Sequence, residues 1–271
     1  MEKLIITVAT TGAVTTRKDT PYLPITPTEI AEEVYRAWNA GASIAHIHVR
    51  DEQGNPSMNY ETFQETVERI KEKCDIIINL TSSGGLDLKE EDRLRVCELH
   101  PELASLDAGS MNFGRHVFLN PPDFLERLAA KMQQHGVKPE IEVFETGMIN
   151  NAMMLAKQGL IKPPYLFQFV LGVPGGMPAS PKNLLHLYES IPEDSIWSVI
   201  GIGRAQLTMN TMAILMGGHV RVGMEDNVYY RPGELAKTNA QFVERIVRLA
   251  RELGREVATV EDARKILKLG N

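Results

Sequence analysis

Short β-rich runs alternate with longer amphipathic stretches along the 271 residues, and few folds accommodate this alternation. The runs that predict strands are 4–10, 44–50, 76–81, 103–108, 140–145, 165–172, 195–201 and 219–224. The stretches that predict helices are 28–41, 59–73, 88–99, 122–135, 147–159, 181–190, 204–216 and 233–254. Helical crossovers of this length join parallel strands, and eight strand-then-helix units make a (β/α)8 barrel.

The chain reads as one domain. A doubly wound sheet is the main alternative, but it usually has fewer strands or carries a second domain. No linker or low-complexity stretch interrupts the pattern, and an α/β barrel fills this length alone. We therefore predict an α/β protein with the TIM (β/α)8 barrel fold over residues 1–271.

Composition and charge argue against several classes of function. The net charge is −6 and the pI is about 5.7, so no nucleic-acid surface is expected. No apolar run reaches the roughly 18 residues of a membrane-spanning helix, so no membrane partner is expected. Residues 4–10 favour a buried strand over a signal sequence, and the two cysteines, Cys74 and Cys97, fit a reducing compartment. The expected location is the cytoplasm.

Two histidines alternate on the second predicted strand, as Ile44-Ala45-His46-Ile47-His48-Val49-Arg50. Side chains two apart on a strand point the same way, so His46 and His48 share one face. An imidazole pair on a rigid strand is half of a metal site. Alternatively, one histidine packs in the core while the other caps a loop.

The other ligands should lie where the barrel strands end, because catalytic groups of such barrels gather there. On the eighth predicted strand His219, Arg221 and Glu225 face inward, with His219 at the stability end of the barrel. Glu225 is the best third ligand for a catalytic zinc, although the same set suits Fe(II). Arg221, Asp226 and Glu142 can form a charged triad beside it, in which one carboxylate removes a proton. A structural ion-pair network is the alternative.

Further polar clusters lie at other strand ends. Ser82-Ser83-Gly84-Gly85 can hold a carboxylate through hydroxyls and backbone N–H groups. Ser105 and Asp107 share one face of the fourth predicted strand, and Glu140 lies on the fifth. Gly201-Ile202-Gly203-Arg204 leads into a helix, where barrels often hold phosphate, but a plain turn fits equally well.

Several motifs together resemble the β-keto acid cleavage enzymes, whose founding member is the 3-keto-5-aminohexanoate cleavage enzyme. The likeness runs nearly end to end. It rests on Thr11-Gly12-Ala13, His46-Ile47-His48-Val49-Arg50, Ser82 to Gly85, Pro139-Glu140-Ile141-Glu142-Val143, Leu171-Gly172-Val173-Pro174-Gly175-Gly176 and Arg221-Val222-Gly223-Met224-Glu225-Asp226-Asn227. The resemblance implies a zinc-dependent TIM barrel, usually a homotetramer. It also implies condensation of a β-keto acid with acetyl-CoA, which yields acetoacetate and a new CoA thioester.

The resemblance assigns roles to individual residues. His46, His48 and Glu225 match the zinc ligands, and Asp226 matches the proposed base. Arg221 and Glu142 match the residues that orient this base. The substrate pocket is matched by Ser82, Gly85 and Ser105.

Position 14 departs from the pattern of members that act on the aminated substrate. Those members carry a glutamate that pairs with the ammonium group, and this chain has Val14. An unpaired buried ammonium is costly, so we expect a β-keto acid with a neutral, apolar tail. Glu145 could alternatively replace the missing carboxylate, which would restore 3-keto-5-aminohexanoate as substrate.

Two other functions compete. A metal-dependent hydrolase of the amidohydrolase type also has an H-x-H pair, but on its first strand and with histidines on the fifth and sixth. Here the pair is on the second, and 140–145 and 165–172 contain no histidine. A non-catalytic metal-binding or ligand-sensing barrel would not need the Arg221–Asp226 pair.

Overall fold

Eight parallel strands close into a barrel in the computed structural model, which describes residues 1–86 and 88–270. Hydrogen bonds join the strands in the order β1-β12-β11-β10-β9-β6-β5-β2, and β2 returns to β1. The strands are β1 (Ile6–Ala9), β2 (Ile44–Ile47), β5 (Ile77–Leu80), β6 (Leu103–Asp107), β9 (Lys138–Val143), β10 (Tyr165–Leu171), β11 (Ser195–Gly201) and β12 (His219–Val222). The predicted TIM (β/α)8 barrel is confirmed.

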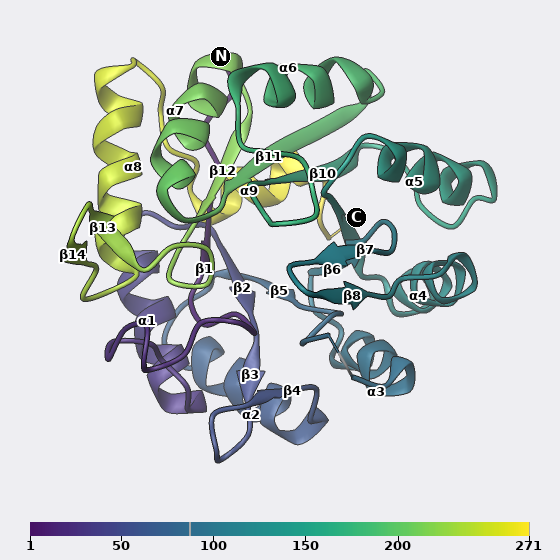
Figure 1. Cartoon of the computed structure of the whole chain (residues 1–271), viewed down its shortest axis with the longest axis horizontal. Helices are drawn as coiled ribbons and strands as arrows, with labels where there is room; N and C mark the ends of the chain where they lie inside the picture. Colours follow the sequence, from purple (N-terminus) through teal and green to yellow (C-terminus); the bar gives the residue numbers. More distant parts are fainter. Residues whose placement is uncertain (87, 271) are drawn as a thin grey trace.

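A ring of helices surrounds the strands (Figure 1). They are α1 (Pro27–Ala40), α2 (Tyr60–Lys71), α3 (Glu90–Arg95), α4 (Pro122–His135), α5 (Gly147–Lys157), α6 (Pro181–Ser190), α7 (Gln206–Met216) and α8 (Ala240–Glu252). Two 3-10 turns flank members of this ring: η1 (Val96–Leu99) continues α3, and η2 (Gly203–Ala205) precedes α7. Among the described residues, no helix is both long and apolar enough to cross a bilayer.

Local signals set the helix ends. Thr26 and Glu29 form a capping box at the start of α1, in which each side chain accepts a hydrogen bond from the backbone N–H of the other residue. Asn59 caps α2 through its side-chain oxygen. Gly136 and Gly217 end α4 and α7 in the left-handed conformation, which glycine adopts without a steric penalty.

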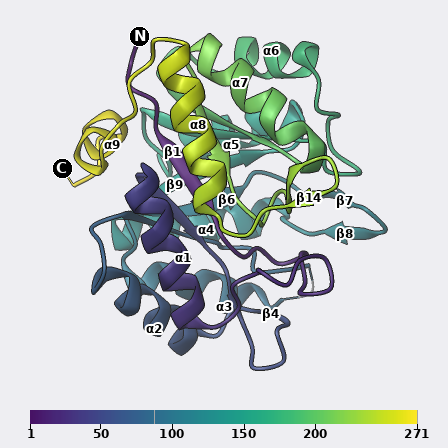
Figure 2. The ribbon, with the colours of Figure 1, turned by 90° about the vertical axis from the view of Figure 1, so that its left-hand side faces the viewer.

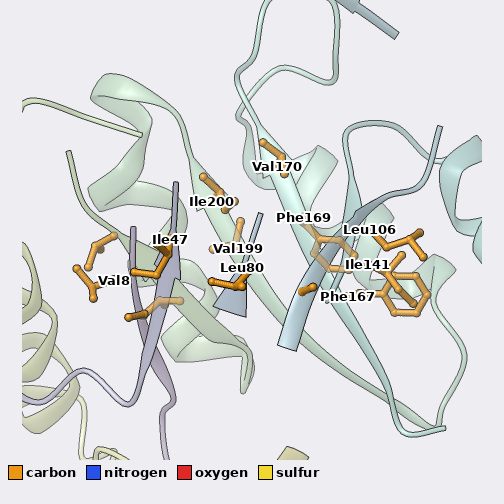
Figure 3. Packing of buried hydrophobic residues seen from close by; sticks show 14 of the residues in the cluster. Val8, Ile47, Leu80, Leu106, Ile141, Phe167, Phe169, Val170, Val199 and Ile200 are labelled. Carbon is orange, nitrogen blue, oxygen red and sulfur yellow. The ribbon is translucent and has the colours of Figure 1, made fainter. Parts of the chain in front are cut away.

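The strands separate two apolar layers. Outward side chains such as Val8, Ile47 and Leu80 pack against the helix ring (Figure 3). Inward side chains at the strand starts form a second cluster, which α9 (Val260–Leu267) closes through Ala263 and Leu267. That cluster contains Ile5, Ile44, Ile77, Leu103 and Leu166. Figure 2 shows α9 outside the helix ring, next to the C-terminus. This second apolar cluster fills one end of the barrel, so the polar groups lie at the other end.

Several predicted boundaries were wrong because short hairpins extend from the strand ends. The predicted helix 233–254 begins only at Ala240, since β13 (Tyr229–Arg231) and β14 (Glu234–Leu235) form a hairpin before it. The predicted strand 44–50 leaves the barrel after Ile47, where β3 (Val49–Arg50) pairs with β4 (Pro56–Ser57). A third hairpin joins β7 (Met111–Phe113) and β8 (His116–Phe118).

Two strands also end earlier than predicted. The run 219–224 stops at Val222, because Gly223 has φ +143° and a Cβ there would lie 1.9 Å from the Ala9 carbonyl oxygen. The run 140–145 corresponds to residues 138–143, which leaves Glu145 outside the sheet and exposed. Glu145 and Glu225 therefore lie beyond the ends of their strands rather than within the sheet.

Candidate active site

Two imidazoles and one carboxylate meet inside the barrel. His46 lies on β2, His48 follows that strand, and Glu225 follows β12. Glu225 Oε1 lies 3.8 Å from His46 Nε2 and 3.3 Å from His48 Nε2. Since ligand atoms of all three lie within 4.8 Å of one another, a single cation can contact each of them. The strand alternation thus brings the predicted ligands together.

The chemical state of these groups suits a divalent cation. Burial, followed by the charge of Arg221, holds the pKa of His46 well below its usual value, so the ring is neutral and can donate a lone pair. Burial would raise the pKa of Glu225, but the charge of Arg221 holds it well below its usual value, so the carboxyl is ionised. Among the described residues, no group donates a hydrogen bond to the buried Glu225 Oε2. A site with two imidazoles, one carboxylate and a buried oxygen of this kind fits zinc.

Gly12 fixes the position of Glu225. Its φ is +64°, and a Cβ there would lie 2.4 Å from Glu225 Cγ. Arg50, buried at the base of the same loop, donates from Nε to the Gly12 carbonyl oxygen at 2.8 Å and from Nη2 to the Thr15 carbonyl oxygen at 2.8 Å. The loop after β1 therefore packs directly against the third ligand.

Arg221 gathers three carboxyl groups beside the histidines. It contacts both oxygens of Asp226, at 3.0 and 3.1 Å, and Glu142 Oε1 at 3.3 Å. Its Nη2 also donates to Glu225. Burial raises the pKa of Asp226 to about 6 although Arg221 opposes the shift. The predicted triad of Arg221, Asp226 and Glu142 is therefore assembled in the structure.

Asp107 is a further carboxyl group that the sequence placed on a strand without assigning a role. It is buried, and burial raises its pKa while the charge of Arg93 opposes the shift. Glu142 is its neighbour, and burial followed by the charge of Asp107 raises the pKa of Glu142 well above normal. A protonated Glu142 can donate to Asp107, which reduces the charge in this part of the site.

Hydrogen bonds with Ser105 and Arg93 fix the turn that follows β5. The backbone N–H of Ser82 donates to Ser105 Oγ at 3.1 Å, and the buried Ser82 hydroxyl has no partner within residues 1–86 and 88–270. Arg93 donates from Nε to the Ser82 carbonyl oxygen at 2.7 Å, with its guanidinium 4.1 Å from the centre of the Phe124 ring. Arg93 was not recognised in the sequence, where an arginine in a charged helix resembles a solvated surface residue.

The three ligand candidates and the Arg221 triad line one cavity that opens to solvent. Its polar wall includes the three ligand candidates, Ser105, Gly85 and the Arg221 triad, whereas Ser83 rather than Ser82 reaches the cavity. Its apolar wall is formed by Val14, Leu86, Phe113, Phe118, Phe144 and Val173. Val14 lies at the mouth and is 67% exposed. One end of the cavity therefore suits polar chemistry and the other an apolar tail.

Two other predicted features lie outside this constellation. Glu145 does not line the cavity, and its carboxylate accepts a hydrogen bond from the Gly147 backbone at 2.9 Å. In the turn before α7, the Gly203 N–H donates to the Asp226 carbonyl oxygen at 2.7 Å, which commits this donor to the protein. His219 lies at the opposite end of β12, as expected, where its Nδ1 accepts from the Ile5 N–H.

Comparisons with known proteins agree with this architecture. The sequence profile described as "beta-keto acid cleavage enzyme" matches residues 3–269. The chain is 51% identical over 271 residues to the 3-keto-5-aminohexanoate cleavage enzyme of Fusobacterium nucleatum, covering 99% of both chains. It is 39% identical to the 3-oxoadipate:acetyl-CoA acetyltransferase of Cupriavidus necator, covering 98% of this chain and 94% of that one.

A solved structure supports the fold independently. The binary complex of ObcA with oxaloacetate superposes with a TM-score of 0.79 at 24% identity, covering 93% of this chain and 68% of that one. With a family match over nearly the whole sequence and two relatives of almost the same length, the chain belongs to the β-keto acid cleavage enzyme family.

Proposed function

We propose that this protein is a zinc-dependent β-keto acid cleavage enzyme. It condenses a β-keto acid with acetyl-CoA and releases acetoacetate and a new acyl-CoA thioester. The observation that carries this proposal is the Arg221–Asp226 pair, which lies in the same cavity as the His46, His48 and Glu225 donor set. The family membership and the acetyl-CoA-dependent activity named for a relative support the same reaction class.

His46, His48 and Glu225 would hold the cation. A bound zinc ion would supply Lewis-acid polarisation of the keto group, which such an open site provides. Ser83 and the backbone around Gly85, which line the cavity, would bind the substrate carboxylate and keto group. Ser82, which the family resemblance assigned to this role, lies behind them with its side chain buried, and Ser105 supports the turn. These residues fix the orientation of the reacting carbon.

Asp226 would act as the general base. The most acidic carbon of a β-keto acid lies between its keto group and its carboxylate, and Asp226 would accept a proton from it. This carbon then bonds to the acetyl carbonyl carbon of acetyl-CoA, whose bond to the CoA sulfur breaks. The CoA sulfur bonds to the old keto carbon, the bond between that carbon and the deprotonated carbon breaks, and the deprotonated carbon takes the proton back from Asp226. The acetyl group leaves in acetoacetate, and the tail leaves as the CoA thioester. Arg221 orients the Asp226 carboxylate during these steps. The same guanidinium also donates a hydrogen bond to Glu142.

The substrate tail would be neutral and apolar. Val14, Phe113 and Phe118 offer no charge to an ammonium group, and Glu145 lies outside the cavity. The relatives carry names with different tails, one amino-substituted and one ending in a carboxylate, so family membership alone leaves the tail open. Cleavage of 3-keto-5-aminohexanoate itself is the second candidate, favoured by the 51% identity to an enzyme of that name.

The experiment is an assay of acetoacetate formation from acetyl-CoA with β-ketohexanoate or its 5-amino analogue. We expect CoA-dependent turnover that a chelator abolishes and zinc restores, with a higher kcat/KM for β-ketohexanoate. A higher kcat/KM for the amine would refute the tail assignment. Hydrolysis without CoA would favour the amidohydrolase type, and zinc binding without any turnover would favour the non-catalytic barrel.

We further propose a cytoplasmic homotetramer. Large apolar side chains lie exposed on the adjacent helices α6 and α7, namely Leu185, Tyr188, Leu207 and Leu215. Contact between copies would remove this apolar surface from water. Light scattering coupled to size-exclusion chromatography tests the assembly, and a monomeric mass at micromolar concentration would contradict it. Both cysteines are free and buried, as expected in a reducing compartment.

A further inference from the structure

A chain of buried polar side chains runs below the proposed metal site. The register of β2 against β5 places His46 beside Asn79, and the register of β6 against β9 places Ser105 beside Glu140. His46, Asn79 and Glu140 are 2%, 0% and 1% exposed. Bulk solvent does not reach these groups, and buried polar groups of this kind normally have hydrogen-bond partners.

Glu140 determines how the Asn79 amide is oriented. Asn79 Nδ2 donates to Glu140 Oε1 at 2.6 Å. With Nδ2 turned to Glu140, Asn79 Oδ1 points away from it, and this oxygen has no hydrogen-bond partner in the described part of the chain.

His46 supplies the complementary atom. Its Nε2 faces Glu225, whereas its buried Nδ1 has no partner among the described residues. His46 and Asn79 are paired in the parallel register of β2 and β5, so their side chains lie next to each other on the inner face of the barrel. A neutral imidazole carries one proton, and placing it on Nδ1 leaves the Nε2 lone pair free.

We propose that Asn79, oriented by Glu140, accepts a hydrogen bond from His46 Nδ1 and thereby fixes His46 in the tautomer whose Nε2 faces the metal. Asn79 is thus a positioning residue. This inference rests on the metal site of the proposed function. Groups that hold the second nitrogen of a ligand histidine fix both its tautomer and its ring orientation, and their removal typically weakens metal affinity by about 10–100-fold.

The first test measures zinc affinity by competition with a chelating dye, with no substrate present. Asn79→Leu removes the acceptor at similar volume, and we expect a 10–100-fold weaker zinc affinity. Glu140→Gln keeps an oxygen that accepts from Asn79, so its affinity should stay near that of the wild type. Gln168→Leu is the matched control, because Gln168 is an equally buried amide of the barrel interior that bonds Ser198 rather than His46.

The possible results separate the explanations. Equal zinc affinity in Asn79→Leu and the wild type overturns the inference, while the proposed function stands. Weakening in Glu140→Gln but not in Asn79→Leu also overturns it, because Glu140 would then be a direct ligand; ligand atoms of His46, Glu140 and Glu142 do lie within 4.8 Å of one another. A wild-type protein without zinc affinity would overturn both the metal site and this inference.

The second test needs no change at Asn79, so it remains informative if Asn79→Leu fails to fold. Long-range proton–nitrogen NMR of the zinc-loaded wild type reports which nitrogen of each histidine carries the proton. We expect a protonated Nδ1 for His46, identified by its loss in His46→Gln, and slow exchange of this proton with solvent. A His46 ring with its proton on Nε2, or with none on Nδ1, would overturn the inference.

Discussion

Arg221 donates a hydrogen bond to each carboxylate oxygen of Asp226, from Nε to Oδ2 at 3.0 Å and from Nη2 to Oδ1 at 3.1 Å. Two-point pairing of this kind fixes a carboxylate in direction as well as in charge. Both side chains are almost fully buried, so water does not screen the pair. Asp226 is therefore oriented before a substrate arrives, which suits a group that must remove a proton from carbon.

Asp226→Asn tests this role. The amide has nearly the same shape but cannot accept the proton, so kcat should fall by about 10²–10⁴-fold. Zinc content should stay at the wild-type level, because the donor set consists of His46, His48 and Glu225. Steady-state kinetics and metal analysis of the purified protein measure both. Loss of zinc together with activity would make Asp226 a ligand rather than a base.

Val14→Glu tests the basis of tail selectivity. The side chain at position 14 lies at the cavity mouth and is largely exposed, so a glutamate can be accommodated there. A carboxylate at this point would attract an ammonium group. We expect the ratio of kcat/KM for the 5-amino analogue to that for β-ketohexanoate to rise about 10-fold, equivalent to ~1.4 kcal/mol.

Val14→Gln is the control for that change, because it matches glutamate in size and polarity but carries no charge. Its substrate ratio should stay close to that of the wild type. An equal shift in both variants would mean that polarity or shape, and not charge, determines the selectivity at this position.

Gly12→Ala should damage the metal site through packing alone. An added Cβ would lie 2.4 Å from Glu225 Cγ, so the ligand must move, and φ of +64° disfavours any side chain. We expect zinc affinity to fall at least about 10-fold, since loss of a supporting contact alone costs that much. The matched control is Gly136→Ala, whose φ is +69° and whose Cβ would have no atom within 4 Å.

The two glycine variants share the backbone penalty, about 1 kcal/mol in the free energy of unfolding. Only Gly12→Ala should lose metal affinity, as measured by dye competition. Equal zinc affinity in both variants would show that Glu225 can move away without cost.

The sequence predicted most of the barrel because its signals are local. The alternation at His46, the capping box at Thr26 and the terminal glycine Gly136 each involve residues only a few positions apart. The helix α9 was missed because it closes the barrel through contacts with strand starts distant in sequence, such as Ile44 and Leu103. Its eight residues also followed the predicted final helix without a strand between them.

The metal donors and the charged triad were predicted from strand faces together with the family resemblance, and the structure places them in one cavity. Their support was harder to find. Asn79 and Glu140 acquire a partner only when the barrel closes and sets the register between strands. Arg93 reaches the Ser82 turn from α3, and no periodic pattern reveals such a contact. The role of a supporting residue depends on its neighbours in the folded structure. A ligand candidate, in contrast, can be recognised in the sequence by its residue type and spacing.

The His219 ring predicts how stability depends on pH. Burial, followed by the charge of Arg255, lowers its pKa to about 3, and its Nδ1 accepts from the Ile5 N–H at 3.1 Å. An exposed histidine in the unfolded chain titrates near 6.5. Between these values unfolding takes up a proton, so this group destabilises the fold as the pH falls from about 6.5 toward 3 and has no such effect above that range.

The free energy of unfolding should therefore fall more steeply with decreasing pH in the wild type than in His219→Gln. A glutamine oxygen can still accept from Ile5 but cannot be protonated, and the other titrating groups are common to both proteins. The difference in slope should approach one proton, about 1.4 kcal/mol per pH unit, between pH 6 and 5. Denaturant unfolding of the two metal-free proteins at about pH 7.5, 6 and 5, on both sides of the unfolded-state pKa, measures it. Parallel curves would mean that His219 becomes protonated inside the folded barrel, in which case its hydrogen bond with Ile5 must break below neutral pH.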